Sequence, residues 1–125
     1  MAMTQERFKA CVESCHACAE ACDRCAAACL HEENPDRMAR CIEMDMDCAD
    51  ICRLAATYMS RASTYTQQLA ALCVEVCEAC AAECAKHPMD HCQDCAQACR
   101  RCASECRRVG DSAARMGVRR AAASG

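Results

Sequence analysis

The sequence is poor in aromatic residues and contains no long apolar run. Its 125 residues include no tryptophan, one phenylalanine and two tyrosines, too few for the stacking surfaces on which proteins bind single-stranded nucleic acid. The formal net charge is −3 with both signs interspersed, so no basic surface for nucleic acid is expected. Charged residues recur every few positions, which argues against a membrane-spanning helix. We therefore expect neither nucleic acid nor membrane among the partners.

Export signals are also lacking. The first residues, MAMTQERFKAC, contain no apolar segment and no twin arginine, and Arg-Arg pairs occur only at 100–101, 107–108 and 119–120, too late in the chain to direct export. We expect a cytoplasmic protein, in which thiols stay reduced. In that compartment a cysteine-dense chain indicates metal binding rather than disulfides.

Large aliphatic side chains are scarce as well. Leucine, isoleucine, valine and phenylalanine together number 12, whereas alanine numbers 27 and cysteine 18. So few large hydrophobes would ordinarily indicate disorder. Alanine, however, has the highest helix propensity, and a protonated buried thiol packs like a small hydrophobe. We predict an all-α domain over residues 1–109 with a narrow, sulfur-rich core, followed by a flexible tail over 110–125.

The cysteines are periodic. Between Cys11 and Cys29 the gaps between successive cysteines are 4, 3, 4, 3 and 4 residues, which is the period of one buried face of an α-helix. We call the positions that follow this 3-and-4 spacing the seam of a helix. The seam returns over residues 73–84 and 92–106, and in a thinner form with Cys41, Cys48 and Cys52.

Turn-forming residues divide the chain into four helices. We expect them over about residues 4–30, from Pro35 to 58 or 59, over 65–86 and over 89–108, with Asn34 as the N-cap before Pro35. The segment CVESCHACA at residue 11 is echoed by CVEVCEACA at residue 73, which suggests two related helical hairpins. Short loops favour an antiparallel, up-down-up-down four-helix bundle.

This connectivity predicts two different ends of the bundle. One end, which we call the His-rich mouth, would hold residues with soft or borderline metal-ligand side chains: His31, Met38, His87, Met89 and His91. The opposite end would be closed by a hydrophobic cluster of Phe8, Leu54, Tyr58, Met59, Tyr65, Leu69, Leu72 and Val109. We expect metal to enter at the first end.

The seam spacing suits soft monovalent metal. Side chains at i and i+4 of a helix are about 5–6 Å apart at Cβ, and a linear sulfur–metal–sulfur unit with bonds of roughly 2.3 Å spans roughly 4.6 Å. Cu(I) is strongly thiophilic. Eighteen buried thiolates would carry a charge that is too costly to bury unless it is neutralised. One Cu(I) per bridging thiolate neutralises it, whereas zinc at four thiolates per ion leaves most of it in place.

Two other functions remain open at this point. One is a zinc- or cadmium-buffering, metallothionein-like protein, and the other is a thiol redox buffer, which would need an exposed thiol of low pKa. Simple core packing, disulfides and iron–sulfur ligation are weaker interpretations of the seam, because helical i,i+4 pairs fit disulfide geometry poorly and no iron–sulfur run is present. No catalytic set stands out, so we expect no enzyme.

Without metal, protonated thiols should leave the core neutral and the protein folded, unlike a zinc finger.

Single residues near the seam carry weaker signals. Among the mouth residues, His91 and then His87 are the best candidate ligands beside the thiols, ahead of Met38, Met89 and His31. Met44 is expected to fill the core, and His16 to lie on the surface. Asp45 and Asp47 are interpreted as part of a solvated face.

The chain resembles the bacterial copper storage proteins, which are four-helix bundles lined with cysteines that bind many Cu(I) ions. The resemblance rests on the C-x-x-x-C-x-x-C runs, on the thinner second helix, and on H-P-M-D-H-C at residues 87–92, and it covers about residues 8–108. It implies the cytosolic branch of the family, a homotetramer, cytosolic copper donors or acceptors as partners, and admission of copper by His87 and His91. It also implies copper ligation by all eighteen cysteines: Cys11, Cys15, Cys18, Cys22, Cys25, Cys29, Cys41, Cys48, Cys52, Cys73, Cys77, Cys80, Cys84, Cys92, Cys95, Cys99, Cys102 and Cys106.

Overall fold

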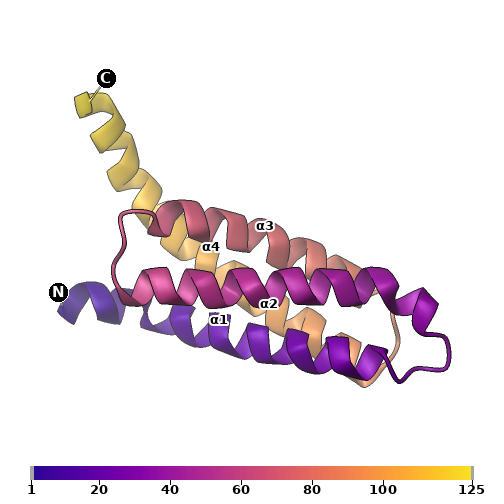
Figure 1. The fold of residues 1–125 in the computed structure, drawn as a ribbon. Coiled ribbons are helices and arrows are strands. Elements are labelled where there is room, and N and C mark those ends of the chain that lie inside the picture. Colours follow the sequence, from indigo (N-terminus) through magenta and orange to yellow (C-terminus); the bar gives the residue numbers. More distant parts are fainter. Residues whose placement is uncertain (1, 125) are drawn as a thin grey trace.

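The protein is an antiparallel bundle of four α-helices (Figure 1). The computed structural model describes the backbone of residues 2–124 and the side chains of residues 6–110. The helices are α1 (Ala2–Cys29), α2 (Ala39–Ser60), α3 (Thr66–Cys84) and α4 (Asp90–Ser124), with a short 3₁₀ helix η1 (Pro35–Met38) before α2. No strand occurs among the described residues. The prediction of an all-α four-helix bundle is confirmed.

The helices form a ring in which each packs against the helix before it and the helix after it, and α4 closes the ring against α1. Alternation along the ring brings the end of α1, the start of α2, the end of α3 and the start of α4 to the same end of the bundle (Figure 1). None of the described helices is long and apolar enough to cross a membrane.

The start of the second helix differs from the prediction. Asn34 and Pro35 do begin a helical segment, but it is the 3₁₀ helix η1, and the Asn34 side chain makes no capping hydrogen bond. The α-helix proper begins at Ala39. Proline fixes its own φ but donates no hydrogen bond, and a tighter first turn is common at helix N-termini.

The fourth helix is longer than expected. We predict its end near residue 108, but α4 continues to Ser124 beyond the bundle (Figure 1). The segment after Gly110 loses the seam, yet it is rich in alanine and arginine and has no proline, so its helix propensity stays high. Side chains of residues 111–125 lie outside the described residues, and the predicted flexibility of this segment stays a prediction.

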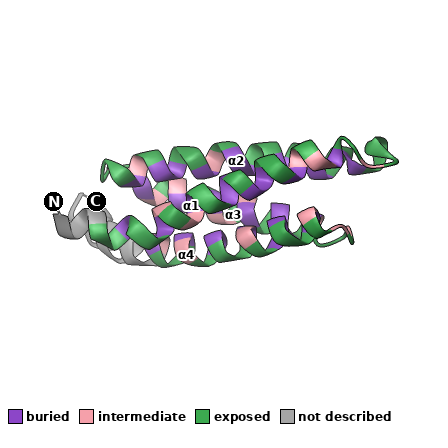
Figure 2. Ribbon diagram, turned by 90° about the horizontal axis from the view of Figure 1, so that it is seen from below, coloured by how far each residue is buried: buried purple, intermediate pink, exposed green. Residues whose placement is uncertain are grey.

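The core follows the seam on every helix. All eighteen cysteines are buried, with at most 1% of any of them exposed, and the buried positions line the inner faces of the four helices (Figure 2). Small alanines such as Ala55, Ala70 and Ala96 are fully buried beside them, which lets the helices approach closely. Sulfur therefore occupies the space that leucine and isoleucine fill in ordinary bundles.

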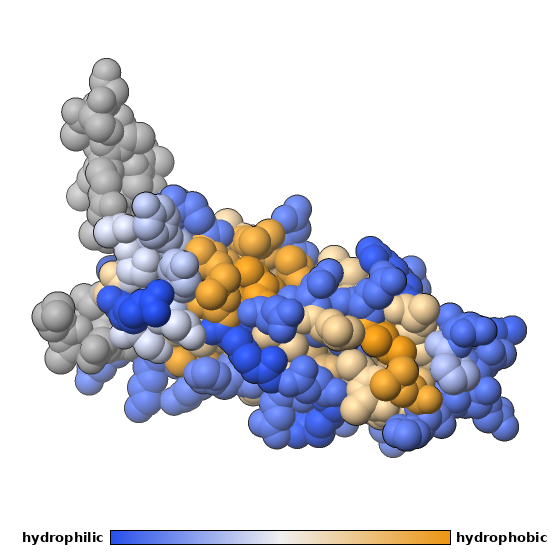
Figure 3. Space-filling view, viewed as in Figure 1, coloured by the Kyte–Doolittle hydropathy of each residue, from blue (hydrophilic) through white to orange (hydrophobic). Residues whose placement is uncertain are grey.

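The hydrophobic cluster at the closed end is smaller than predicted. Phe8, Met59 and Val109 are buried there. Three other predicted members are exposed instead, namely Leu54 (44%), Tyr65 (61%) and Leu72 (45%). Connectivity predicts the correct end of the bundle for these three residues. Their side chains lie on the outer surface because they are off the seam of their helices. An apolar patch over the first half of α3 is visible in Figure 3.

Candidate metal centre

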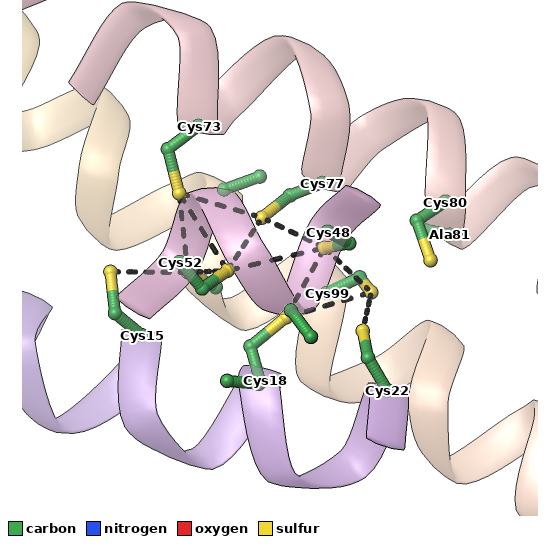
Figure 4. Close-up of a cluster of buried hydrophobic side chains, with 14 of the residues drawn as sticks. Cys15, Cys18, Cys22, Cys48, Cys52, Cys73, Cys77, Cys80, Ala81 and Cys99 are labelled. Carbon is green, nitrogen blue, oxygen red and sulfur yellow. Dashed lines mark hydrogen bonds between the residues drawn. The ribbon is translucent and has the colours of Figure 1, made fainter. Parts of the chain in front are cut away.

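The eighteen thiols form one continuous buried set along the axis of the bundle. Each seam turns its cysteines inward, and the sulfurs of α1, α2 and α3 point toward one another in the middle of the core (Figure 4). All eighteen are free thiols. The structure thus brings together every cysteine that the sequence analysis singled out.

The closest sulfur–sulfur distances join different helices. Cys11 Sγ lies 3.3 Å from Cys106 Sγ, and Cys18 Sγ lies 3.6 Å from Cys99 Sγ. Pairs at i and i+4 on one helix are slightly farther apart, for example 4.0 Å between Cys48 and Cys52. An isolated metal on each i,i+4 pair is therefore not the arrangement that the core favours, because every thiol also has neighbours across the bundle.

Thiols of three helices converge into groups of four whose sulfurs all lie within 4.8 Å of one another. Cys18 and Cys48 belong to two such groups, and so do Cys22 and Cys99. Shared sulfurs are what bridged metal–thiolate clusters require. Five of the groups are Cys15/Cys73/Cys102/Cys106, Cys18/Cys48/Cys52/Cys77, Cys18/Cys22/Cys48/Cys99, Cys22/Cys80/Cys95/Cys99 and Cys25/Cys29/Cys41/Cys92.

Burial keeps thiols near the mouth protonated while no metal is bound. Desolvation raises the pKa of Cys92 to about 11 and raises the pKa of Cys29 above its ordinary value. A charged thiolate loses its hydration in such a site. These thiols are therefore neutral at physiological pH, and a soft metal must displace their protons to bind.

Asp45 is the one acidic side chain in the described core, and here the sequence interpretation was wrong. Instead of lying on a solvated face, Asp45 is 0% exposed. Its Oδ1 accepts hydrogen bonds of 3.3 Å from each of the thiols of Cys80, Cys84 and Cys95. Burial, and after it the charge of the neighbouring Cys95, raise the pKa of Asp45 to about 8.

The spacing along α2 indicates that Asp45 is buried, but an acidic residue is usually exposed, and the prediction followed the residue type. Cys41, Asp45, Cys48 and Cys52 are separated by 4, 3 and 4 residues, the same register as the cysteines of α1. Asp45 therefore stands where the pattern of α2 calls for a thiol. Asp47, two residues later and outside this register, is exposed as predicted.

His91 is the mouth histidine that contacts the thiols. Its Nδ1 lies 3.5 Å from the sulfurs of both Cys25 and Cys92 and 3.9 Å from that of Cys29. Its Nε2 lies 2.8 Å from Oε2 of Glu32. One ring nitrogen of His91, Nδ1, thus faces sulfur, and the other, Nε2, faces a carboxylate.

His87 lies at the same end but makes a different contact. Its Nε2 is 3.1 Å from Oε2 of Glu83, one turn earlier on α3, and its hydrogen-bond partner is this carboxylate rather than a thiol. Among the other mouth residues, Met38 is buried, Met89 is half-buried and His31 is exposed. The structure therefore brings His91, but not His31, to the thiols.

Comparison with known proteins gives a consistent result. A model of the copper storage protein family matches residues 4–111. A Cu(I)-bound copper storage protein, BsCsp3, is 46% identical, with 81% of this chain and 95% of that chain covered and a TM-score of 0.78. No curated protein matches the sequence.

Two structures of a protein from Streptomyces lividans are also similar. One is described as a cytosolic copper storage protein carrying five coppers; it is 39% identical, with 89% of this chain and 98% of that chain covered and a TM-score of 0.83. The other, loaded with 10 copper equivalents, is 41% identical, with 85% of each chain covered and a TM-score of 0.81.

Proposed function

Because this chain belongs to the copper storage protein family, we propose that it stores many Cu(I) ions as thiolate-bridged clusters inside its bundle. The observation that carries this proposal is the continuous set of eighteen buried thiols with shared, closely spaced sulfurs. Cu(I) accepts two or three thiolate ligands and tolerates bridging sulfur. Residues 1–109 hold the whole copper-binding domain in this proposal.

Charge favours Cu(I) over divalent metal at high loading. Each monovalent ion that displaces one thiol proton leaves the core neutral, whereas divalent ions at four thiolates each would add negative charge to a buried site. Asp45 also adds little negative charge to the core. With its pKa raised to about 8, its carboxyl group stays largely neutral near pH 7 and can donate a hydrogen bond to a thiolate. We place Asp45 beside the eighteen cysteines as part of the site.

We infer that copper enters at the His-rich mouth. His91 offers a borderline nitrogen ligand next to three thiols and is itself partly exposed, with 22% of its side chain accessible. His87 lies at the same end in the loop before α4, with its ring held by Glu83, and we place it as a secondary contact for arriving metal. The buried cluster of Phe8, Met59 and Val109 closes the opposite end.

The His91→Ala variant tests this route. We expect it to slow uptake of the first copper equivalent from a Cu(I)–bicinchoninate complex by about tenfold, while the final number of bound ions changes by no more than about one. His16→Ala, on the exposed face of α1, is the matched control. Equal stopped-flow rates for the two variants would exclude His91 from the route.

We propose a cytosolic location and a homo-oligomeric state, a tetramer by resemblance to the family. The location is supported by the similar cytosolic protein of Streptomyces lividans. Oligomerisation is supported by the exposed apolar side chains of Leu54, Tyr65 and Leu72, which a second copy could cover. Cytosolic copper donors and acceptors would then meet the chain at the His-rich mouth. No catalytic function is proposed.

Anaerobic titration of the reduced protein tests the storage function. Against a chromophoric competitor for Cu(I), we expect about one tightly held ion per thiol, roughly 15 to 20 per chain. Zn(II) should saturate near four ions. Saturation by four or fewer Cu(I) ions would contradict storage.

A zinc- or cadmium-buffering function is the second candidate. One specific observation favours it: the four-thiol groups draw on several helices at once, as Cys15, Cys73 and Cys102 do, and can surround a tetrahedral ion. The same pair of titrations decides between the two metals. A thiol redox function is disfavoured, because it needs an accessible thiol and every cysteine is buried.

A further inference from the structure

Glu32 is an acidic residue in the loop after α1 that touches a residue on α4. Its Oε2 lies 2.8 Å from Nε2 of His91, and about a third of its side chain is exposed (31%). The loop holds it in place, since its backbone N–H donates to the carbonyl oxygen of Cys29 at 3.3 Å. The last residue of α1, Cys29, is a thiol facing His91, and the loop that follows supplies Glu32, the carboxylate behind the ring.

The contact has a defined consequence for the ring nitrogens of His91. An ionised carboxylate only accepts hydrogen bonds, so in the neutral imidazole the proton lies on Nε2 and the lone pair lies on Nδ1. Nδ1 is the atom that faces the sulfurs of Cys25, Cys29 and Cys92 at 3.5–3.9 Å. A carboxylate behind a histidine commonly fixes the tautomer and orientation in which the ring binds metal.

We propose that Glu32 is a positioning residue for His91: its carboxylate holds the imidazole as the Nε2–H tautomer and directs the Nδ1 lone pair at the outermost thiols. Copper reaching the mouth then meets a nitrogen and three sulfurs already in place. The tautomer part of this proposal stands on the metal-free geometry, whereas its effect on copper uptake rests on the proposed storage function.

The second histidine–carboxylate pair at this end shows what sets Glu32 apart. Glu83 pairs with His87 at 3.1 Å, but the two residues are only four positions apart, at the end of α3 and in the loop that follows it, and the described hydrogen bonds of His87 join it to no thiol. The Glu32–His91 pair instead links the loop after α1 to the start of α4. Loss of the Glu32 carboxylate should therefore free the imidazole ring of His91 to turn.

The first test uses the metal-free, reduced protein. At pH 8, where an ordinary imidazole is neutral, ¹⁵N spectra of the histidine side chains report which ring nitrogen carries the proton. In the wild type, the Nε2 signal of His91 should be that of a protonated nitrogen and the Nδ1 signal that of an unprotonated one. Glu32→Ala should move both signals toward the average of a tautomer mixture.

Glu33→Ala is the matched control, because Glu33 is the next residue of the same loop, is exposed and carries the same charge. It should leave the His91 signals unchanged. An unchanged tautomer in Glu32→Ala, or an equal change in Glu33→Ala, would overturn the proposal without any reference to copper.

The second test measures transfer of the first copper equivalent from Cu(I)–bicinchoninate. Glu32→Ala should lower the rate about tenfold relative to Glu33→Ala, and should have no further effect in a His91→Ala background, as expected when one residue acts through the other. Equal rates for Glu32→Ala and Glu33→Ala, with normal total copper binding, would overturn the effect on uptake alone. Weak copper binding by the wild type would instead overturn the storage function and leave the tautomer result standing.

Discussion

Asp45 shows how one side chain can occupy a thiol position and change the chemistry of the core. Its carboxyl group accepts hydrogen bonds from Cys80, Cys84 and Cys95 at 3.3 Å and is fully buried. A buried, unpaired carboxylate is costly, and the group responds by holding its proton, with its pKa raised to about 8. The spacing of α2 predicts a buried side chain at this position, but the acidic residue type favours solvent, and only the structure decides between them.

Asp45 should make the metal-free protein less stable as the pH rises. A carboxyl whose pKa is higher in the folded state than in the unfolded state contributes stability that is fully present below the unfolded pKa, about 3.9, and is lost as the pH rises through the folded pKa, which is about 8. Asp45→Asn removes the titrating group and therefore this loss of stability. Between pH 5 and pH 7, the free energy of unfolding of the variant minus that of the wild type should therefore increase by about 1 kcal/mol per pH unit.

Urea unfolding of the reduced, metal-free proteins at several pH values measures this slope. Asp47→Asn changes an exposed aspartate of the same helix and should keep the wild-type slope. If Asp45→Asn and the wild type lose stability in parallel over this window, the folded carboxyl does not hold its proton.

At the scale of single helices, the 3-and-4 spacing of cysteine predicts which face of each helix is buried, and the structure confirms it on all four helices. Helix ends are less predictable, because they depend on loop contacts and on propensity outside the seam. The 3₁₀ start at Pro35 and the continuation of α4 to Ser124 are examples. Neither changes the register of the thiols.

The turn between α2 and α3 contains a residue in an unfavourable backbone conformation. Ala62 has φ of 51°, in the left-handed region that favours glycine. Its N–H donates to the carbonyl oxygen of Met59 and that of Ser63 to Tyr58, both at 3.0 Å, so the turn closes the end of α2 in the way that a glycine usually does.

Ala62→Gly should therefore raise the free energy of unfolding by about 0.5–1 kcal/mol without altering copper capacity. Ala71→Gly, at an exposed position inside α3, should lower it by about the same amount. Urea unfolding of the reduced, metal-free variants measures both. Destabilisation by both substitutions would show that the turn does not require a left-handed residue.

At the scale of the whole molecule, the connectivity of the helices predicts which residues share an end of the bundle, which no single motif does. Four helices with short loops place His87 and His91 at one end of the bundle, and this much follows from the sequence. The pairing of Glu32 with His91 does not, because it depends on the path of the loop between Cys29 and Pro35 in space. Connectivity likewise predicts the end of the bundle at which Leu54 and Leu72 lie, but it does not predict that their side chains are exposed on the outer surface.

The central claim is that the bundle builds the thiol core before any metal binds. Its neutral thiols pack as small hydrophobes, and alanine-rich helices need no metal to form. A zinc finger, in contrast, is unfolded until its ion binds.

Far-ultraviolet circular dichroism of the reduced protein, recorded anaerobically before and after loading with Cu(I), tests this claim most directly. The account predicts a fully helical spectrum for the metal-free protein that changes by no more than a few per cent on loading. A metal-free spectrum typical of an unfolded chain, with helix appearing only as copper is added, would contradict it.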